Sequence, residues 1–494
     1  MSRRLFLAGT AASVAVGCSN RGSSSGSSTA VPTAPVFRAT EPPADAKPAV
    51  TAVYRARATE VDFAGRVVKT VAYDGEVPGK LLRARKGDLV EITIHNEMTE
   101  ATTIHWHGLA IVNSMDGVPG VTQPDITAGS SFTYRFVVPD GGTYWFHPHH
   151  GLQLEHGLYA PLVIDDPDDT PVDQEYVLVL DDWLDGTGTT PEDELARIRE
   201  AGAAMGSMSG MDHSSMGGMA RSPLLGGDAG DALYPFHLIN GRPPGDPATL
   251  DPQPVAGSKV RLRIINAGGD TAYRFAVGGH RLTVTHTDGF AVEPAVVDAL
   301  VIGMGERYDV TFTVASGVWP IVALAEGKDQ RAVAVLRTRD ATATTAPGLT
   351  TGPAELEGKW LRYSDLRAAE RSALRPPAKV RSIPVRLTGG MGAYDWAIDG
   401  RRYGKHQPIM IDEGEWVSLD ITNSTMMWHP IHLHGHTPQL GAAPGSIRKD
   451  TVNILPMNSA SLVFQADNPG KWMLHCHNAY HLETGMATTV EYQS

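Results

Sequence analysis

Histidines occur in this 494-residue sequence in closely spaced pairs, and their spacing points to metal binding. Four motifs hold these pairs: His-Trp-His, His-Pro-His, His-Pro-Ile-His-Leu-His and His-Cys-His. In an extended strand, side chains two residues apart project from the same face, so each pair offers two imidazoles to one site. The paired residues are His105, His107, His147, His149, His432, His434, His475 and His477. Imidazoles without carboxylates suit transition ions and not Ca²⁺ or Mg²⁺, and copper is the leading candidate.

Cys476 lies between His475 and His477, so its side chain points to the opposite face of the strand and serves a different metal. Two imidazoles, one thiolate and a long axial thioether form a blue-copper electron-transfer site. The residues that supply this set are His429, Cys476, His481 and Met486. Because Cys476 is covalently continuous with both neighbouring histidines, an electron that arrives there is a short through-bond step from the other cluster.

Each of these features has a simpler explanation when it is taken alone. A single His-x-His pair is more often two exposed strand histidines, and an isolated cysteine or methionine is more often part of a core. Four pairs at equivalent positions of a repeat, together with the spacing from Cys476 to His481 and Met486, favour ligands instead. The remaining histidines are assigned structural or supporting roles, and they include His95, His150, His156, His280, His286 and His436.

An internal repeat becomes visible when strands are aligned by their alternation of apolar residues. The first strand of each copy is expected at residues 88–96, 258–266 and 415–423, and each ends in asparagine. A second strand that closes in a glycine turn is expected at residues 131–142, 306–317 and 461–470. The residues of the first strands that share one face are Val90, Ile92, Ile94, Val260, Leu262, Ile264, Val417, Leu419 and Ile421.

The paired histidines recur at fixed distances from these elements. Nine and eleven residues after the asparagine, and five and seven residues after the glycine, the first and third copies carry all eight of them. The middle copy carries Phe275, Val277, Val322 and Leu324 at these positions. We therefore expect two metal-binding sandwiches of antiparallel strands that flank a metal-free spacer of the same fold.

Composition supports an all-β protein with three domains. The sequence is rich in Gly, Pro, Thr and Val and shows little long helical periodicity, which favours short strands joined by turns. The domains are expected at residues 48–168, 172–345 and 355–494. The net charge of −13, without a stripe of clustered Lys and Arg, argues against a nucleic-acid partner. We expect a monomer.

The four motifs, in this order and spread over the whole mature chain, resemble those of the multicopper oxidase family of laccases and bacterial copper oxidases. The resemblance implies three consecutive cupredoxin-like Greek-key β-sandwich domains. It also implies an enzyme with one type 1, one type 2 and two type 3 coppers, which takes single electrons at the type 1 copper. O₂ would be reduced to water at the three-copper cluster, where four coppers store the four electrons that the reaction requires.

The family motifs imply a role for each ligand. His105 and His432 would bind the type 2 copper. One type 3 copper would be held by His107, His147 and His477, and the other by His149, His434 and His475. The chain also resembles exported actinobacterial oxidases implicated in copper tolerance, on the Met-Asp-Gly at residues 115–117 and the start of the sequence.

Asp116 is the candidate acid for steering protons and reduction intermediates, because O₂ reduction consumes protons. A turn-forming role in Met-Asp-Gly is the alternative. Some bacterial relatives carry an acid directly after the last type 1 histidine, whereas Leu482 occupies that place here and Glu483 follows it.

A methionine-rich segment within a predicted insertion at residues 203–221 is the candidate site for a cuprous substrate. Thioethers favour Cu(I), and the segment, which also contains His213, carries Met205, Met208, Met211, Met216 and Met219. It lacks a helical apolar stripe, so we expect a flexible loop; a disordered insertion without function is the alternative. Met427, two residues before His429, is either a further soft donor or a core residue.

The first residues form a separate unit. Ser-Arg-Arg-x-Phe-Leu at residues 2–7 and a short apolar run predict a twin-arginine export signal over residues 1–17, followed by a Ser/Gly/Pro-rich tether over residues 18–47. Residues 15–18 resemble a lipoprotein cleavage site, so Cys18 is a candidate lipid anchor, with simple cleavage as the alternative. We expect export to the periplasm or cell envelope.

Several functions remain to be compared. We expect Cu(I) as the reductant, with phenols or aromatic amines also oxidised; a laccase that acts mainly on phenols has the same coppers and is the alternative. A copper nitrite reductase would lack the complete set of cluster histidines. A copper carrier would not need the relay centred on Cys476, and a structural sandwich module explains none of the ligands.

Overall fold

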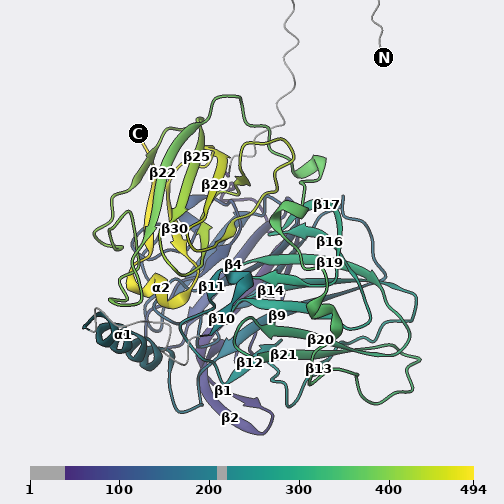
Figure 1. Ribbon diagram of the computed structural model, residues 1–494. Coiled ribbons are helices and arrows are strands. Elements are labelled where there is room, and N and C mark those ends of the chain that lie inside the picture. Colours follow the sequence, from purple (N-terminus) through teal and green to yellow (C-terminus); the bar gives the residue numbers. More distant parts are fainter. Residues whose placement is uncertain (1–38, 208–219, 494) are drawn as a thin grey trace, which may run out of the picture. The chain divides into compact units, whose positions relative to one another are not determined.

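Three pairs of β-sheets follow one another along the chain in the computed structural model, which describes residues 39–207 and 220–493 (Figure 1). The structure therefore has the expected fold class, which is all-β with cupredoxin-like domains. The export signal, most of the tether, Cys18, Met208, Met211, His213, Met216 and Met219 lie outside the described residues. Among the helices of the described residues, none is both long and apolar enough to cross a membrane.

The first pair of sheets has four strands in each sheet. One sheet has the order β2 (Arg66–Tyr73), β1 (Val50–Phe63), β4 (Leu89–Asn96) and β6 (Ser131–Val137). The other has the order β3 (Leu82–Arg85), β8 (Ala160–Asp165), β7 (Gly142–His147) and β5 (His105–His107). The short β5 is an edge strand, and this position leaves its two histidines at the border of the sandwich.

The second pair of sheets belongs to the middle copy of the repeat. Its first sheet has the order β12 (Phe236–Ile239), β9 (Gln174–Trp183), β14 (Lys259–Asn266), β19 (Arg307–Thr313), β16 (Leu282–Thr287) and β17 (Phe290–Val297). Its second sheet has the order β13 (Ala248–Thr249), β21 (Gln330–Arg337), β20 (Val318–Ala325), β15 (Tyr273–Val277) and β18 (Leu300–Ile302).

The third pair has five strands in each sheet. One has the order β23 (Ala397–Ile398), β22 (Arg381–Thr388), β25 (Trp416–Asn423), β29 (Ser459–Gln465) and β27 (Gln439–Leu440). The other has the order β24 (Ile409–Ile411), β31 (Ala487–Tyr492), β30 (Lys471–Cys476), β26 (His429–Leu433) and β28 (Thr451–Ile454). A short helix, α2 (Ala479–Thr484), connects β30 to β31.

The repeated asparagine has the same structural task in all three copies. In the first copy the side-chain amide of Asn96 donates to the carbonyl oxygens of Glu100 and Ile126, at 2.7 Å each. Asn266 and Asn423 make the equivalent bonds, and the side-chain oxygen of each asparagine accepts the amide two residues later. A buried side chain thus fixes the loop that leads from the first strand to the next, as the backbone groups of a buried loop require partners.

The apolar residues that the repeat places on one face are all buried. Val90, Val260 and Val417 have no exposed surface, and neither do the other six residues of this set. In the middle copy the positions that correspond to ligands belong largely to the core, since Phe275, Val277 and Val322 are fully buried. This core packing is the physical reason why the middle copy keeps the fold without a metal. The predicted domain boundaries stay predictions.

The structure corrects one expectation about the methionine-rich segment. Met205 is not in a loop, because α1 (Pro191–Ser207) includes it. Thr190 and Asp193 form a reciprocal cap at the start of this helix, at 3.1 and 3.3 Å, and three acidic residues lie in its first turn. Caps and first-turn acids stabilise a helix N-terminus, so the helix continues to Ser207 without a continuous apolar stripe.

Further short elements connect the sheets. Residues 220–228 form a small ribbon of β10 (Arg221–Ser222) and β11 (Gly227–Asp228), with a turn of 3₁₀ helix, η3 (Pro223–Leu225), between them. The other 3₁₀ turns are η1 (Asn113–Met115), η4 (Ala354–Glu357), η5 (Tyr363–Asp365) and η6 (Glu370–Ser372).

Candidate metal centre

The strands bring the paired histidines of the first and third domains together. In the first domain His105 on β5 lies opposite His147 on β7, and in the third domain His432 on β26 lies opposite His475 on β30. The rings of the two domains are in direct contact, because His107 stacks on His432 with centroids 3.8 Å apart. A cluster therefore forms between domains from residues that lie more than three hundred positions apart in the sequence.

The ligand atoms of the eight histidines form several overlapping groups. The ligand atoms of His107, His147 and His477 all lie within 4.8 Å of one another. The Nε2 atoms of His105 and His432 are 3.3 Å apart. His434 and His475 have their Nε2 atoms 3.0 Å apart, and His149 has ligand atoms within 4.8 Å of those of His105 and His434. The assignment of individual histidines to individual ions stays a prediction.

Hydrogen bonds on the outer nitrogens determine which nitrogen faces the cluster. The Nδ1 atoms of His105, His147 and His475 contact the backbone carbonyl oxygens of Asp116, Pro148 and Cys476, at 2.9, 3.0 and 2.9 Å. A carbonyl oxygen only accepts, so these Nδ1 atoms carry the proton. Their Nε2 atoms therefore direct a lone pair inward, as a metal ligand requires.

His107 has the opposite orientation. Its Nε2 atom lies 3.1 Å from both the Oδ1 atom of Asp450 and the Oγ1 atom of Thr451, which leaves Nδ1 for the metal. Several inward nitrogens are buried without any partner, namely His107 Nδ1, His147 Nε2, His149 Nε2 and His477 Nε2. Buried polar atoms are almost always satisfied. These orphaned lone pairs are what a cluster of copper ions would satisfy, so the donor set fits copper.

Burial keeps these imidazoles neutral. Burial first, and the neighbouring histidines second, hold the pKa values of His149 and His434 well below the usual range. The same causes lower the pKa of His475 to about 3. A neutral imidazole is the form that binds a metal, so the site is ready for metal ions near neutral pH without the need to remove protons.

A second group of donors lies on the other side of β30. The Sγ atom of Cys476 is 3.7 Å from His429 Nδ1 and 3.4 Å from His481 Nδ1, and Met486 is fully buried in the same core. Cys476 and its neighbour His475 both belong to β30, but their side chains point to opposite faces of the strand. One strand therefore contributes to both groups of donors. These side chains could hold a metal ion together, and their assignment to a type 1 copper stays a prediction.

Supporting contacts orient the two type 1 histidines. The Nε2 atom of His429 lies 2.9 Å from the hydroxyl of Thr425, and that of His481 lies 2.9 Å from Oδ2 of Asp231. These partners leave Nδ1 of each ring free to face Cys476. Trp396 covers both rings, with centroids 5.1 Å from His429 and 4.5 Å from His481.

Asp116 lies against the three-copper cluster. Its Oδ2 atom is 3.0 Å from His434 Nδ1, its Oδ1 atom is 3.2 Å from His105 Nδ1, and the side chain is almost fully buried. A carboxylate that only formed a turn would not need these two contacts. The geometry supports the predicted catalytic role, which stays a prediction.

The middle domain also reaches the cluster. Arg307 donates two hydrogen bonds to Asp450, at 2.7 and 2.6 Å, and both side chains are fully buried. Asp450 in turn contacts His107 through Oδ1, and its backbone oxygen accepts from His432 Nδ1 at 2.9 Å. The guanidinium offsets the buried charge of Asp450, which then holds two cluster histidines in place.

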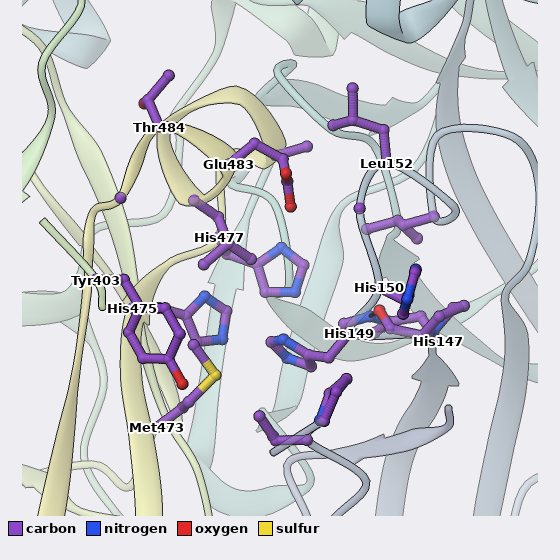
Figure 2. A pocket seen from close by; sticks show the side chains of 18 of the residues that line it. His147, His149, His150, Leu152, Tyr403, Met473, His475, His477, Glu483 and Thr484 are labelled. Atoms are coloured by element: carbon purple, nitrogen blue, oxygen red, sulfur yellow. Dashed lines mark hydrogen bonds between the residues drawn. The ribbon is translucent and has the colours of Figure 1, made fainter. Parts of the chain in front are cut away.

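A cavity of about 470 Å³ leads to the cluster between the first and third domains. Figure 2 shows His147 and His149 on one side of it and His475 and His477 on the other, with Glu483 of α2 on the same side as His477. Burial raises the pKa of Glu483 above its usual value. The cavity thus opens onto four of the eight paired histidines, and Glu483 places an acid at its wall.

Several supporting residues gave no signal in the sequence. Asp231, Asp450 and Arg307 are charged residues in stretches without a motif; Arg307 lies 143 residues from Asp450, and Asp231 lies 250 residues from His481. Met427 was a possible soft donor, but its side chain is only 2 % exposed and packs in the core of the third domain. Packing in the core, the second of the two alternatives, therefore explains why a methionine occurs at this position.

The chain belongs to the multicopper oxidase family. Family descriptions named multicopper oxidase match residues 55–169, 174–341 and 375–494. The protein is thus an oxidoreductase that contains copper and uses O₂ as the electron acceptor.

Known proteins of this family resemble the whole described chain. Multicopper oxidase MmcO of Mycobacterium tuberculosis is 45 % identical over 447 residues, which cover 90 % of this chain and 87 % of that protein. A copper resistance protein A homolog of Pseudomonas syringae is 29 % identical and covers 87 % and 90 % of the two chains. The crystal structure of a laccase from Botrytis aclada superposes with a TM-score of 0.70 at 25 % identity, over 89 % and 87 % of the chains.

Proposed function

We propose that the chain oxidises cuprous ion at the type 1 site and contributes to copper tolerance. The observation that carries this proposal is the carboxylate of Asp231, which bonds to the type 1 ligand His481 at 2.9 Å through one oxygen. Its other oxygen, Oδ1, is buried without a partner. A carboxylate in contact with an electron-accepting histidine suits a cationic reductant better than a neutral phenol.

A second acid strengthens the negative potential at this place. Burial and the neighbouring Asp231 raise the pKa of Asp228 to about 6. Burial is the larger cause, and a metal cation bound nearby would stabilise the ionised carboxylate. Two acids beside one type 1 histidine therefore favour a cation as substrate.

Both flanks of the methionine-rich segment lie near these residues. Upstream, α1 packs on the loop that covers His481, because a Cβ atom added at Gly202 would lie 2.4 Å from the backbone oxygen of Met391. Downstream, the β10–β11 ribbon pairs with the third domain through a bridge between Asp228 and Met427. Soft thioethers in the segment between these flanks would raise the local concentration of Cu(I). The names of the copper resistance relatives agree with this role.

The chain's own residues prepare the reaction. Copper, when bound, supplies one-electron redox chemistry at the type 1 site and reduction of O₂ at the three-copper cluster. Asp231 orients His481 toward its ligand position and places a buried negative charge beside it. Trp396 and the core around Cys476 exclude water from the thiolate. The carboxylate of Asp116 orients His105 and His434 beside the cluster, and Glu483, whose pKa is raised by burial, is an acid at the wall of the cavity that leads to it.

The test compares two reductants in one assay. Oxygen uptake by copper-loaded protein is measured with cuprous ion and with a bulky phenol, for the wild type and for a variant with Met205, Met208, Met211, Met216 and Met219 replaced by Ser. Cuprous oxidation should fall more than phenol oxidation, since only the cation uses the thioethers. The Met410→Ser variant, on an exposed part of β24, is the matched control. Equal loss with both reductants, or a preference of the wild type for phenol, would make the chain a general laccase.

We also propose that the chain is exported by the twin-arginine pathway, since the sequence begins with the expected signal. Lipidation of Cys18 is tested by the intact mass of protein from the membrane fraction. A mature terminus that lacks Cys18 would exclude the lipid anchor.

A further inference from the structure

A buried carboxylate of the metal-free middle domain connects the two segments that hold His481. Asp270 follows the repeated asparagine of the middle copy by four residues and has no exposed surface. Its loop is itself fixed, because Asp182 accepts the backbone amides of Gly269 and Asp270 at 2.8 and 3.2 Å. Asp270 is thus held rigidly by its own domain.

Four donors converge on this carboxylate. Oδ1 accepts from the backbone amide of Asp231 at 3.1 Å and from the side-chain amide of Asn478 at 2.6 Å. Oδ2 accepts from the backbone amide of Ala232 at 2.9 Å and from Nζ of Lys328 at 2.8 Å. The cation of Lys328, equally buried, offsets the charge of Asp270.

One pair of these bonds positions the helix that carries His481. Asn478 is the N-cap of α2, and its side-chain oxygen accepts the amides of Tyr480 and His481 at 3.0 and 3.2 Å. Since the side-chain amide of Asn478 is bound to Asp270, the middle domain fixes the cap and therefore the start of the helix. The backbone amide of Ala479 adds a bond of 2.9 Å to the carbonyl oxygen of Gly269.

The other pair positions the residue that contacts His481. The amides of Asp231 and Ala232 hold the loop whose carboxylate accepts from His481 Nε2 at 2.9 Å. The contacts form a closed ring that runs from Asp270 through Asn478 to His481, and through Asp231 back to Asp270. The loop before Asp231 lies close to Asp270, because a Cβ atom added at Gly230 would be 2.4 Å from Oδ2 of Asp270.

We propose that Asp270 is a positioning residue for the type 1 site, which fixes His481 against Asp231 and so maintains the route by which electrons reach the type 1 copper. This role gives the middle domain a function in the reaction although it holds no ligand. The inference does not depend on which reductant the chain prefers.

The Asp270→Asn variant tests this role with little change in volume. An asparagine has one acceptor oxygen, and its amide nitrogen would face two donors whichever way the group is turned. Two of the four bonds must therefore break. In the copper-loaded full chain we expect a shifted type 1 reduction potential and a changed hyperfine splitting in electron paramagnetic resonance. Reduction by an inorganic one-electron donor such as ferrocyanide should slow about 10- to 100-fold.

Reoxidation of the pre-reduced protein by O₂ should keep its wild-type rate, because the three-copper cluster is not touched. The control is Asp309→Asn, which removes a carboxylate of the same domain that is equally buried and bonded to Arg263 at 2.6 Å. This control should lower the thermal midpoint and leave the type 1 potential and spectrum unchanged. Wild-type potential and reduction rate in Asp270→Asn, or an equal shift in Asp309→Asn, would overturn the proposal.

A second variant keeps the test valid if Asp270→Asn does not fold. Asn478→Ser retains an oxygen for the helix cap but is too short to reach Asp270. It should shift the type 1 potential in the same direction, and the double variant should shift it no further than the larger single effect, since both break one ring of contacts. An unchanged potential in Asn478→Ser, or fully additive shifts, would also overturn the proposal.

Discussion

At the level of single residues, each histidine ring has one nitrogen that bonds to a neighbouring protein group. This bond determines which of the two nitrogens is left for a metal. Carbonyl oxygens bind Nδ1 of His105, His147 and His475, whereas Asp450 and Thr451 bind Nε2 of His107. The motifs of the sequence name the ligands, but this choice of nitrogen depends on partners from other loops.

Asp116→Asn should slow the reoxidation of reduced protein by O₂ about 10- to 100-fold, which is typical for the loss of a residue that supports metal ligands. The carboxylate contacts His105 and His434, and the amide cannot offer two acceptors. The blue absorption of the type 1 site should persist, because no contact links Asp116 to Cys476 among the described residues. Stopped-flow absorbance measures both the rate of reoxidation and the blue absorption. An unchanged turnover would exclude a catalytic role for Asp116.

His237 provides a pH prediction that does not involve a copper ligand. Burial, and then the charge of Lys328, lower the pKa of His237 to about 3. The unfolded chain has a histidine pKa of about 6.5, so between these values the unfolded state binds a proton that the folded state does not. The free energy of unfolding therefore falls as pH falls through this window, by about 1.4 kcal/mol per pH unit for this group.

His237→Asn retains a side-chain amide to face Tyr273, which lies 2.8 Å from His237 Nδ1, but it does not titrate. The variant should be less stable at pH 7 and should lose less further stability toward pH 5. Denaturation midpoints of copper-free protein at several pH values measure this slope. Parallel curves for the variant and the wild type would contradict the prediction.

At the level of elements, a turn places the candidate acid Asp116 against the strand that carries His105 and His107. Gly117 follows Asp116 with φ +87°, and a Cβ atom there would lie 1.7 Å from the carbonyl oxygen of Ile104, directly before β5. Only glycine allows the Met-Asp-Gly turn to approach this strand so closely. The sequence motif is thus explained by backbone contact as well as by the acid.

Gly117→Ala should displace β5 and reduce the copper content of the three-copper cluster, because a backbone atom cannot move aside as a flexible side chain can. Gly87→Ala is the matched control, since it has φ +88° with no atom within 4 Å of the added Cβ. The free energy of unfolding of Gly87→Ala should fall only by the cost of the strained backbone conformation, about 1–3 kcal/mol. Metal analysis and thermal midpoints compare the two, and equal behaviour would show that the clash at Gly117 has no effect.

Across the whole molecule, the middle domain connects the two copper-binding domains electrostatically. Arg307→Met would leave Asp450 charged and buried without its cation, and we expect a loss of about 3–5 kcal/mol in the free energy of unfolding. The copper content of the cluster should fall too, because Asp450 orients His107 and His432.

The control for Arg307 is Arg83→Met, which breaks a pair of similar geometry with Asp165 at 2.6 Å that is about half exposed. Such exposed pairs contribute about 1 kcal/mol or less. Chemical denaturation of both variants gives the comparison. A loss at Arg307 no larger than that at Arg83 would disprove the bridging role of the buried pair.

The fold class, the threefold repeat and the ligand motifs could all be predicted from the order of the amino acids. This was possible because alternation along a strand and the spacing of His-x-His are local properties, which the chain expresses within ten or so residues. The candidate ligands of the type 1 site were inferred in the same way, from His429 and from the spacing of Cys476, His481 and Met486 within eleven consecutive residues.

Only the tertiary structure determined how the sites are supported. Asp231, Asp270, Arg307 and Asp450 act across domain boundaries, and contacts over such distances leave no periodic signal in the sequence. Likewise, Met427 is core and Met205 is helical because packing and a capped helix start outweigh what their side chains suggest in isolation. Local chemistry thus predicted the metal ligands, and the three-dimensional packing of three domains determined which charges and hydrogen bonds hold these side chains in place.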